Sequence, residues 1–179
     1  MPQGSSRGLR GSGLEELVNL TNDRYREAGL ALIQKIPTPI TPVRIDKETK
    51  HITLAYFDQK STIDYIGAVQ GIPVCFDAKE CAIDTFALAN IHPHQISFMR
   101  DFEKQGGIAF FLVSYTKKEK LYYLRYSEAY KFWARMEEGG RKSIAFDELS
   151  DEWFFQSKNG TVIPYLEMIQ KDLDRREEM

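Results

Sequence analysis

Cysteine is scarce in this 179-residue chain, and long apolar runs are absent. Cys75 and Cys81 lie six positions apart, without the close pairing of a zinc knuckle or a redox motif, so reduced structural thiols are expected. The longest apolar run spans residues 108–113, far short of the roughly 20 residues that a membrane-spanning helix needs. The sequence therefore excludes a disulfide scaffold and a transmembrane helix.

The N-terminal segment also lacks the apolar core of a secretory signal, because residues 1–13 are rich in Gly, Ser and Arg. We expect a cytoplasmic protein with no membrane partner. A chain of 179 residues that is 42% hydrophobic and 28% charged is typical of one globular domain. The expected organisation is a single domain over residues 1–179, with residues 1–12 as a flexible arm.

A strong excess of basic residues is missing too, since the net charge is -2. Such a balance argues against a nucleic-acid partner, because Lys and Arg drive phosphate binding. The charges are unevenly distributed, however. Residues 1–146 hold 20 basic and 17 acidic side chains, whereas residues 147–179 hold 4 basic and 9 acidic ones. The acidity belongs to the C-terminal fifth, and DNA binding by the rest of the chain stays open.

Helical periodicity and apolar strand patterns alternate along the chain, which favours an α/β fold with a mixed central sheet flanked by helices. Ser12 is the expected N-cap of the first helix, Gly29 its stop, and Ser127 the expected cap of the third. Helices are predicted over residues 13–28, 93–105, 127–138 and 164–176, and strands over 30–36, 62–69, 72–79, 108–115 and 121–126.

Residues 37–60 form a separate feature, because three prolines between positions 37 and 42 force an extended path. Segments 43–46 and 51–57 then alternate polar with apolar residues around the polar turn at 47–50. We predict a hairpin that projects into solvent.

The hairpin of residues 62–79 can be analysed from its register. If Gln70-Gly71 is a two-residue loop, Asp64 lies directly opposite Asp77. Because side chains alternate across a strand, Lys79 shares their face, while the opposite face is apolar and belongs to the core. A slip of one residue would move Asp64 to the core face.

Two opposed carboxylates about 5 Å apart repel each other unless a positive charge lies between them. Mg²⁺ resolves that repulsion, since it takes one or two carboxylates together with waters and phosphates. Lys79 is then placed to stabilise negative charge in a transition state. The alternative is a solvated outer face on which Asp77 and Lys79 form an ordinary ion pair.

An acid on the first helix, an Asp on one strand and a D/E-x-K triplet on the next resemble the PD-(D/E)XK nuclease superfamily. More closely, the chain is similar to the RecU-type Holliday junction resolvases of bacteria. The matching stretches are Arg10-Gly11, Leu14-Glu15, Lys35 with Pro37-Thr38-Pro39, Ala55-Tyr56-Phe57, Ser61-Thr62, Asp64-Tyr65, Gly71, residues 76–80, His92, His94-Gln95-Ile96, Phe132-Trp133 and residues 140–144.

The resemblance implies a restriction-endonuclease-like core with a projecting β-hairpin stalk. It also implies Mg²⁺, with Mn²⁺ as a possible substitute, held around Thr62, Asp64, Asp77 and Gln95, and Lys79 as transition-state stabiliser. The chain departs from the family pattern at Asp77, where Glu is usual, and in a shorter N-terminal extension with fewer basic residues.

Glu15 has two interpretations. Ser12-Gly13-Leu14-Glu15 fits a capping box, and the resemblance instead implies a catalytic contact with metal-bound water. His92 and His94 flank Pro93 at a helix start, where caps or packed rings are more typical than metal ligands.

The hairpin at 37–60 has the plain interpretation of a solvated loop, whereas in the family it is a stalk that enters the centre of a four-way junction. The basic residues would then meet phosphates, and Phe57 would stack on an exposed base. The residues expected to contact DNA are Arg10, Lys35, Arg44, Lys47, Lys50, Phe57, Lys60, Arg141 and Lys142.

The resulting hypothesis is a metal-dependent endonuclease that makes paired symmetric nicks in Holliday junctions during recombination and DNA repair. Two identical nicks call for a two-fold homodimer, and recombinase and branch-migration proteins are possible partners. The alternatives are a restriction-like or phage DNA-processing nuclease of the same fold, and a non-catalytic junction-binding or recombinase-modulating protein.

Overall fold

A six-stranded mixed sheet forms the centre of the molecule. The computed structural model describes residues 13–57, 62–159 and 162–178. The strands lie in the order β1-β4-β5-β7-β8-β10; the β5–β7 pair is parallel and the other pairs are antiparallel. This confirms the α/β class and the mixed sheet. The bounds are β1 Ala31–Lys35, β4 Tyr65–Val69, β5 Ile72–Cys81, β7 Ile108–Tyr115, β8 Lys120–Arg125 and β10 Phe154–Phe155.

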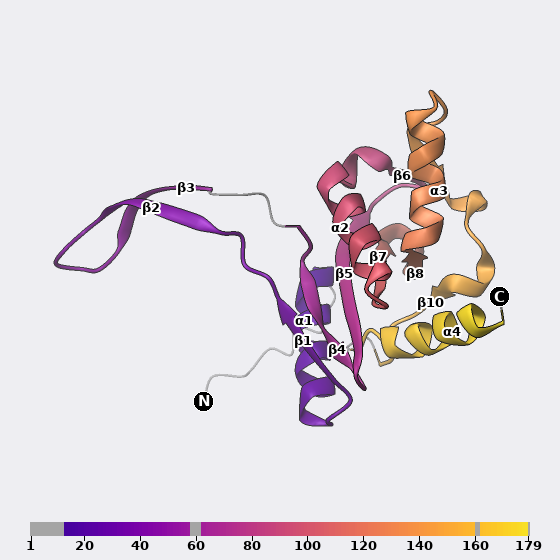
Figure 1. Ribbon diagram of the computed structural model, residues 1–179, viewed down its shortest axis with the longest axis horizontal. Helices are drawn as coiled ribbons and strands as arrows, with labels where there is room; N and C mark the ends of the chain where they lie inside the picture. The colour runs from indigo at the N-terminus through magenta and orange to yellow at the C-terminus, as the bar shows by residue number, and fades with distance from the viewer. Residues whose placement is uncertain (1–12, 58–61, 160–161, 179) are drawn as a thin grey trace, which may run out of the picture.

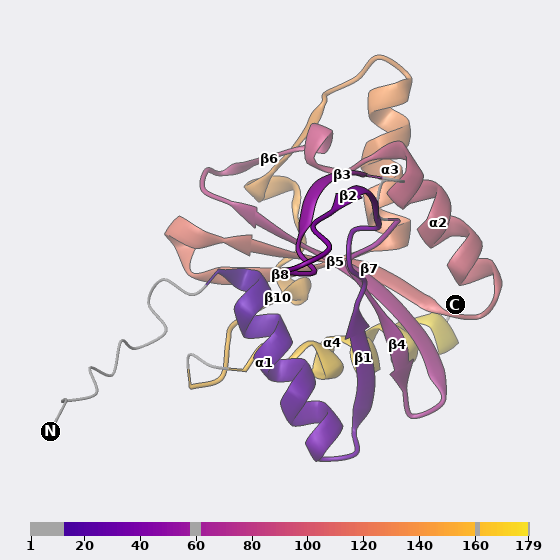
Figure 2. The same cartoon turned by 90° about the vertical axis from the view of Figure 1, so that its left-hand side faces the viewer.

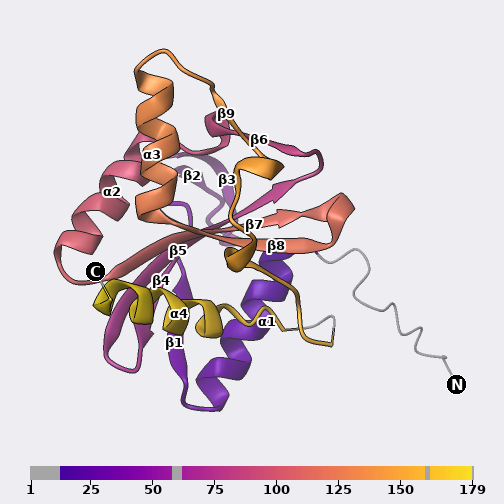
Figure 3. The same ribbon diagram turned by 90° about the vertical axis from the view of Figure 1, so that its right-hand side faces the viewer.

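Helices cover both faces of the sheet (Figures 2 and 3). On one face, α1 (Leu14–Glu27) and α4 (Tyr165–Glu177) pack on a stack of aromatic rings. The ring centroid of Phe76 lies 4.8 Å from that of Tyr65 and 4.9 Å from that of Phe110. The other face carries α2 (Pro93–Lys104) and α3 (Tyr126–Glu137). Residues 108–113 are buried throughout, as expected of a strand covered on both sides.

The hairpin of β2 (Ile40–Ile45) and β3 (Ile52–Phe57) is a sheet of its own that extends away from the body (Figure 1). Asp46 Oδ1 closes its turn by accepting the N–H groups of Glu48 and Thr49 at 2.9 and 2.8 Å. Pro42 lies inside β2 beside a register shift, a place where a missing N–H is tolerated. β2 therefore begins three residues before the predicted strand.

The predicted register of the β4–β5 hairpin is confirmed. Val69 pairs with Ile72 and Tyr65 with Phe76. The turn residues Gln70 and Gly71 have φ of 48° and 86°, as a tight two-residue hairpin loop requires. The loop therefore sets which side chains of the two strands face each other.

Several local predictions are wrong. Arg125, not Ser127, is the N-cap of α3, and Gly13 is the N-cap of α1, whereas Ser12 lies outside the described residues. The alternative of a solvated outer face is also wrong at Asp77, which is buried and accepts a hydrogen bond from Gln95 of α2. Short elements were not predicted: β6 Thr85–Ala87, β9 Ser143–Ala145, β10, and 3-10 turns at Leu88–Asn90, Thr116–Lys118, Phe146–Glu148 and Asp151–Trp153 (η1 to η4).

No helix within the described ranges is long and apolar enough to cross a membrane.

Candidate active site

Asp64 and Asp77 lie opposite each other where β4 begins. Asp64 precedes the strand, and its backbone N–H donates to Asp77 Oδ1 at 3.2 Å. The carbonyl oxygen of Asp64 accepts the N–H of Ile36, just beyond β1, at 2.7 Å. Two neighbouring segments, β5 and the end of β1, therefore hold the position of Asp64, and the predicted pairing of the two acids is present.

Asp77 is completely buried, with 0% of its surface exposed. Its Oδ2 accepts the Nε2–H of Gln95 at 2.8 Å and lies 2.6 Å from Lys79 Nζ. Removing a carboxylate from water is costly unless it is paired and hydrogen-bonded, and these contacts meet that need. Lys79 keeps 19% of its side chain exposed, so it links the buried carboxylate of Asp77 to the surface of the protein.

Gln95 occupies the first turn of α2, which begins at Pro93, a favoured residue at that position. The Gln95 Oε1 accepts the N–H of His92 at 3.0 Å, while its amide donates to Asp77. His92 is the N-cap residue of the helix, and its ring stacks on that of His94 with centroids 5.3 Å apart. Gln95 thus ties the start of α2 to the buried carboxylate.

The pKa of Asp64 is raised to about 7, chiefly by burial and then by the hydrogen bond and the charge of Asp77. The charge of Lys79 opposes the shift, and the charge of Glu15 makes the smallest contribution to it. Without a cation, Asp64 therefore binds its proton up to a higher pH than an ordinary carboxyl group does. A divalent cation at this position would displace that proton and favour both ionised carboxylates.

Glu15 and Lys35 form an ion pair at the edge of this cluster, with Oε2 and Nζ 2.5 Å apart. Glu15 lies in the first turn of α1, and Lys35 is the last residue of β1. The expected capping partner, Ser12, lies outside the described residues, and the carboxylate of Glu15 contacts Lys35. The structure therefore places Glu15 and Lys35 near Asp64, whose pKa the charge of Glu15 helps to raise.

The donor set fits Mg²⁺, which needs one or two carboxylates and completes its shell with water. Asp64 and Asp77 are the two acids present, and Thr62 is exposed two residues before Asp64. Within the described ranges no cluster of three His, Cys, Asp or Glu side chains is arranged for a metal. A cation here would keep several open positions for water and substrate.

The hairpin residues expected to contact DNA are exposed. Arg44 lies on β2, Lys47 and Lys50 lie in the turn, and Lys50 has a φ of 62°. Phe57 is 75% exposed, but it pairs with Ile40 at the body end of the hairpin rather than at the tip. Arg10 and Lys60 lie outside the described residues.

Arg141 and Lys142 lie in the segment before β9. Arg141 Nε donates to Ser143 Oγ at 3.0 Å, and its Nη1 lies 3.8 Å from Glu148 Oε2. Lys142 is exposed. Arg141 is therefore partly neutralised within the chain, and Lys142 is the better placed of the two for a phosphate.

Glu80 was not singled out by the sequence analysis, yet its Oε1 accepts the N–H of Leu14 at 2.7 Å. Its position directly after the D-x-K triplet was the available signal. The contact links the strand that carries Asp77 and Lys79 to the first turn of α1.

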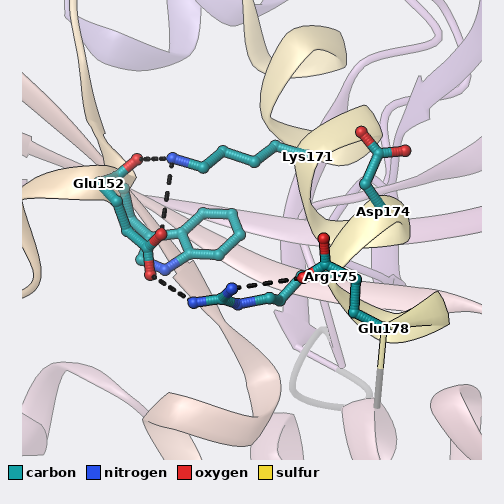
Figure 4. Close-up of a pocket in the computed structure, with 6 residues that line it drawn as sticks. Glu152, Lys171, Asp174, Arg175 and Glu178 are labelled. Atoms are coloured by element: carbon teal, nitrogen blue, oxygen red, sulfur yellow. Dashed lines mark hydrogen bonds and ion pairs between the residues drawn. The ribbon is translucent and has the colours of Figure 1, made fainter.

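A separate pocket is lined by residues of η4 and α4 (Figure 4). Glu152 lies 3.9 Å from Lys171 and 3.7 Å from Arg175, so the charges of its wall compensate one another. This arrangement offers no anion site for DNA. The lining residues are Glu152, Trp153, Lys171, Asp174, Arg175 and Glu178.

Comparison with known proteins identifies the family. The family model described as "RecU: Recombination protein U" matches residues 9–171. "Holliday junction resolvase RecU" of Pediococcus pentosaceus is 39% identical over 172 residues, which cover 93% of this chain and 86% of the relative. The protein of the same name from Leuconostoc mesenteroides is 40% identical over 93% of this chain and 83% of its own length. The "Holliday junction resolvase RecU" of Bacillus pumilus is 44% identical over 151 residues, which cover 82% of this chain and 73% of the relative. With its acid pair, lysine and hairpin in place, this chain belongs to the RecU family.

Proposed function

We propose that this protein is a divalent-metal endonuclease that resolves four-way DNA junctions by hydrolysing phosphodiester bonds during recombination and repair. One observation carries the proposal: a fully buried Asp77 lies opposite Asp64 and is held by Lys79 and Gln95. Relatives that span most of the chain are named Holliday junction resolvases, which supports the junction as substrate.

Asp64 and Asp77 would hold Mg²⁺, or Mn²⁺ in its place. When bound, such a cation would lower the pKa of a coordinated water and neutralise negative charge on the phosphate. The pKa of Asp64 is raised to about 7, so the cation would compete with a proton at this carboxylate. Gln95 keeps the buried carboxylate of Asp77 in one orientation.

Lys79 has a separate role. Its ammonium group lies 2.6 Å from Asp77 Oδ2, and its side chain remains partly exposed. It can therefore approach the scissile phosphate and offset the negative charge that develops on it. Glu15, paired with Lys35 at the edge of the site, would orient water, and Lys35 would also contact the backbone of the DNA.

The β2–β3 hairpin would select four-way junctions over linear duplex DNA. Arg44, Lys47 and Lys50 are exposed on an element that extends from the body, where they would contact phosphates of the junction arms. Phe57 lies at the body end of the hairpin, so it would stack on a base near the catalytic face. Lys142 would add a phosphate contact on the body.

We further propose a two-fold homodimer, because a junction is resolved by two matching cuts and a symmetric dimer places two identical sites. Recombinase and branch-migration proteins are possible partners in the cytoplasm. The organisation proposed for the chain is one nuclease domain with the hairpin as an insertion and residues 1–12 as an arm.

The test uses a labelled four-way junction and a matched duplex, each with and without Mg²⁺. We expect symmetric nicks in two opposing strands of the junction, dependent on the cation, and little cutting of the duplex. Equal cutting of both substrates would favour a nuclease acting on other DNA. Tight junction binding without cleavage in Mg²⁺ or Mn²⁺ would favour a non-catalytic binding protein.

A further inference from the structure

The first turn of α1 takes its cap from a distant residue. Gly13 is the N-cap and has no side chain that could accept a hydrogen bond from the turn, although the first N–H groups of a helix need external acceptors. Glu80 Oε1 accepts the N–H of Leu14 at 2.7 Å from 66 residues further along the chain. A carboxylate at this end of a helix also interacts favourably with the helix dipole.

Glu80 belongs to the catalytic strand. It follows Lys79 on β5, and side chains alternate across a strand, so Glu80 points away from the face that carries Asp77 and Lys79. One segment of β5 thus holds the proposed metal ligand and lysine on one face and the start of α1 on the other.

The first turn of α1 carries a residue of the candidate site. Glu15, next to Leu14, lies 2.5 Å from Lys35 at the end of β1. The following residue, Ile36, donates its N–H to the carbonyl oxygen of Asp64 at 2.7 Å. The contacts therefore close a ring that runs from β5 through α1 and β1 to Asp64, which faces Asp77 on β5 again.

We propose that Glu80 is a positioning residue that fixes the start of α1 relative to β5, and so places the Glu15–Lys35 pair beside Asp64 and Asp77. The inference rests on the proposed function for its catalytic consequence. Glu80 lies behind the catalytic face, so its loss should lower the rate of cleavage and leave junction affinity nearly unchanged.

The experiment compares Glu80→Ala and Glu80→Gln with the wild-type chain. Two properties are measured: amide hydrogen exchange of residues 14–17 in the metal-free, DNA-free protein, and single-turnover cleavage of a four-way junction together with its Kd. Glu80→Ala should speed exchange in this turn about 10-fold and slow cleavage about 10-fold, with Kd within about twofold. Glu80→Gln should stay close to wild type, because its side-chain carbonyl can accept the same hydrogen bond.

Two further variants test the route through Glu15. Glu16→Ala, on an exposed acid of the same turn, is the matched control and should leave both properties unchanged. The double variant Glu80→Ala with Glu15→Gln should cleave no more slowly than the slower of the two single variants, since residues that act as one unit are not additive. If the losses of cleavage rate in the two single variants added up in the double variant, the proposed route from Glu80 through Glu15 would be overturned.

Other outcomes also decide the inference. The inference would be overturned if Glu80→Ala cleaved the junction at the wild-type rate or showed unchanged amide exchange. It would also be overturned if Glu80→Gln cleaved as slowly as Glu80→Ala. If Glu80→Ala fails to fold, Glu80→Asp, with its carboxylate one methylene short, must show faster exchange and slower cleavage. If the wild-type protein cleaves no junction, the proposed function fails, while the exchange data still test the anchoring of α1.

Discussion

Asp77 in the body is fully buried and has contacts from Asp64, Lys79 and Gln95, whereas Phe57 on the hairpin is 75% exposed. The hairpin also exposes Ile52, Leu54 and Tyr56 along β3. A site that stabilises developing charge must be held rigid before its substrate arrives. An element that recognises the shape of DNA instead keeps its side chains accessible. The comparison suggests that chemistry and junction recognition are separable.

Loss of the buried carboxylate should have the largest effect. Asp77→Asn keeps the volume of the side chain but removes one of two charges that would hold the cation. We expect single-turnover cleavage in Mg²⁺ to fall by about 10³-fold or more, while the junction Kd changes by less than about threefold. Asp101→Asn, on an exposed acid of α2, is the control and should cleave normally. Substantial cleavage by Asp77→Asn would remove Asp77 from the mechanism.

Lys79→Ala should come next. The variant loses the positive charge 2.6 Å from Asp77 Oδ2, and removal of one stabiliser of transition-state charge typically costs about 10²-fold in rate. The measurement is single-turnover cleavage at saturating protein. Lys79→Arg should recover part of the rate, because it keeps the charge with a different geometry. Full activity in Lys79→Ala would contradict the assigned role.

The hairpin gives the reverse pattern. Lys47→Ala with Lys50→Ala should weaken junction binding about 10-fold at moderate salt, because two phosphate contacts are lost. Duplex affinity should fall less, and the cleavage rate at saturation should stay within about twofold. Lys104→Ala with Lys131→Ala, on exposed lysines of the body, is the charge-matched control. Equal losses for junction and duplex would refute the stalk interpretation.

The pH dependence of stability should show the smallest effect. Asp64 has a folded-state pKa raised to about 7, above its ordinary value, so its stabilising contribution is complete below pH ~4 and is lost as pH rises through ~7. Because Asp64 is only half-buried, we discount this to about 1 kcal/mol, or roughly 2–4 °C in Tm.

Thermal unfolding checks this between pH 5 and pH 8 without metal. The Tm of the wild-type protein should decline more steeply with pH than that of Asp64→Asn, which carries no titrating carboxylate there. Mg²⁺ should raise the wild-type Tm more at pH 8 than at pH 6, since the cation competes with the proton. Parallel profiles for the two proteins would contradict the raised pKa.

The sequence predicted the parts of the site that depend on local geometry. The register that opposes Asp64 and Asp77 follows from the two-residue turn at Gln70-Gly71, whose positive φ values fix the pairing. The complete burial of Asp77 was not predictable in this way, because it depends on how α2 packs over the strand. Gln95 reaches Asp77 only in the folded arrangement.

The cap of α1 shows the same limit. A local pattern around Ser12 and Glu15 suggested a capping box, but Leu14 takes its acceptor from Glu80, 66 residues away. The β6–β9 pair was missed because each strand has three residues, too few for a periodic pattern. Contacts between distant segments therefore carry the information that the sequence pattern lacks.

The most direct test of whether chemistry and junction recognition are separable uses two variants, Asp77→Asn and Lys47→Ala with Lys50→Ala. The cleavage rate and the Kd of each are measured on one four-way junction. We predict that the first variant loses its rate and keeps its affinity, and that the second loses affinity and keeps its saturated rate. If each variant loses both properties to the same extent, chemistry and junction recognition are not separable, and the account is contradicted.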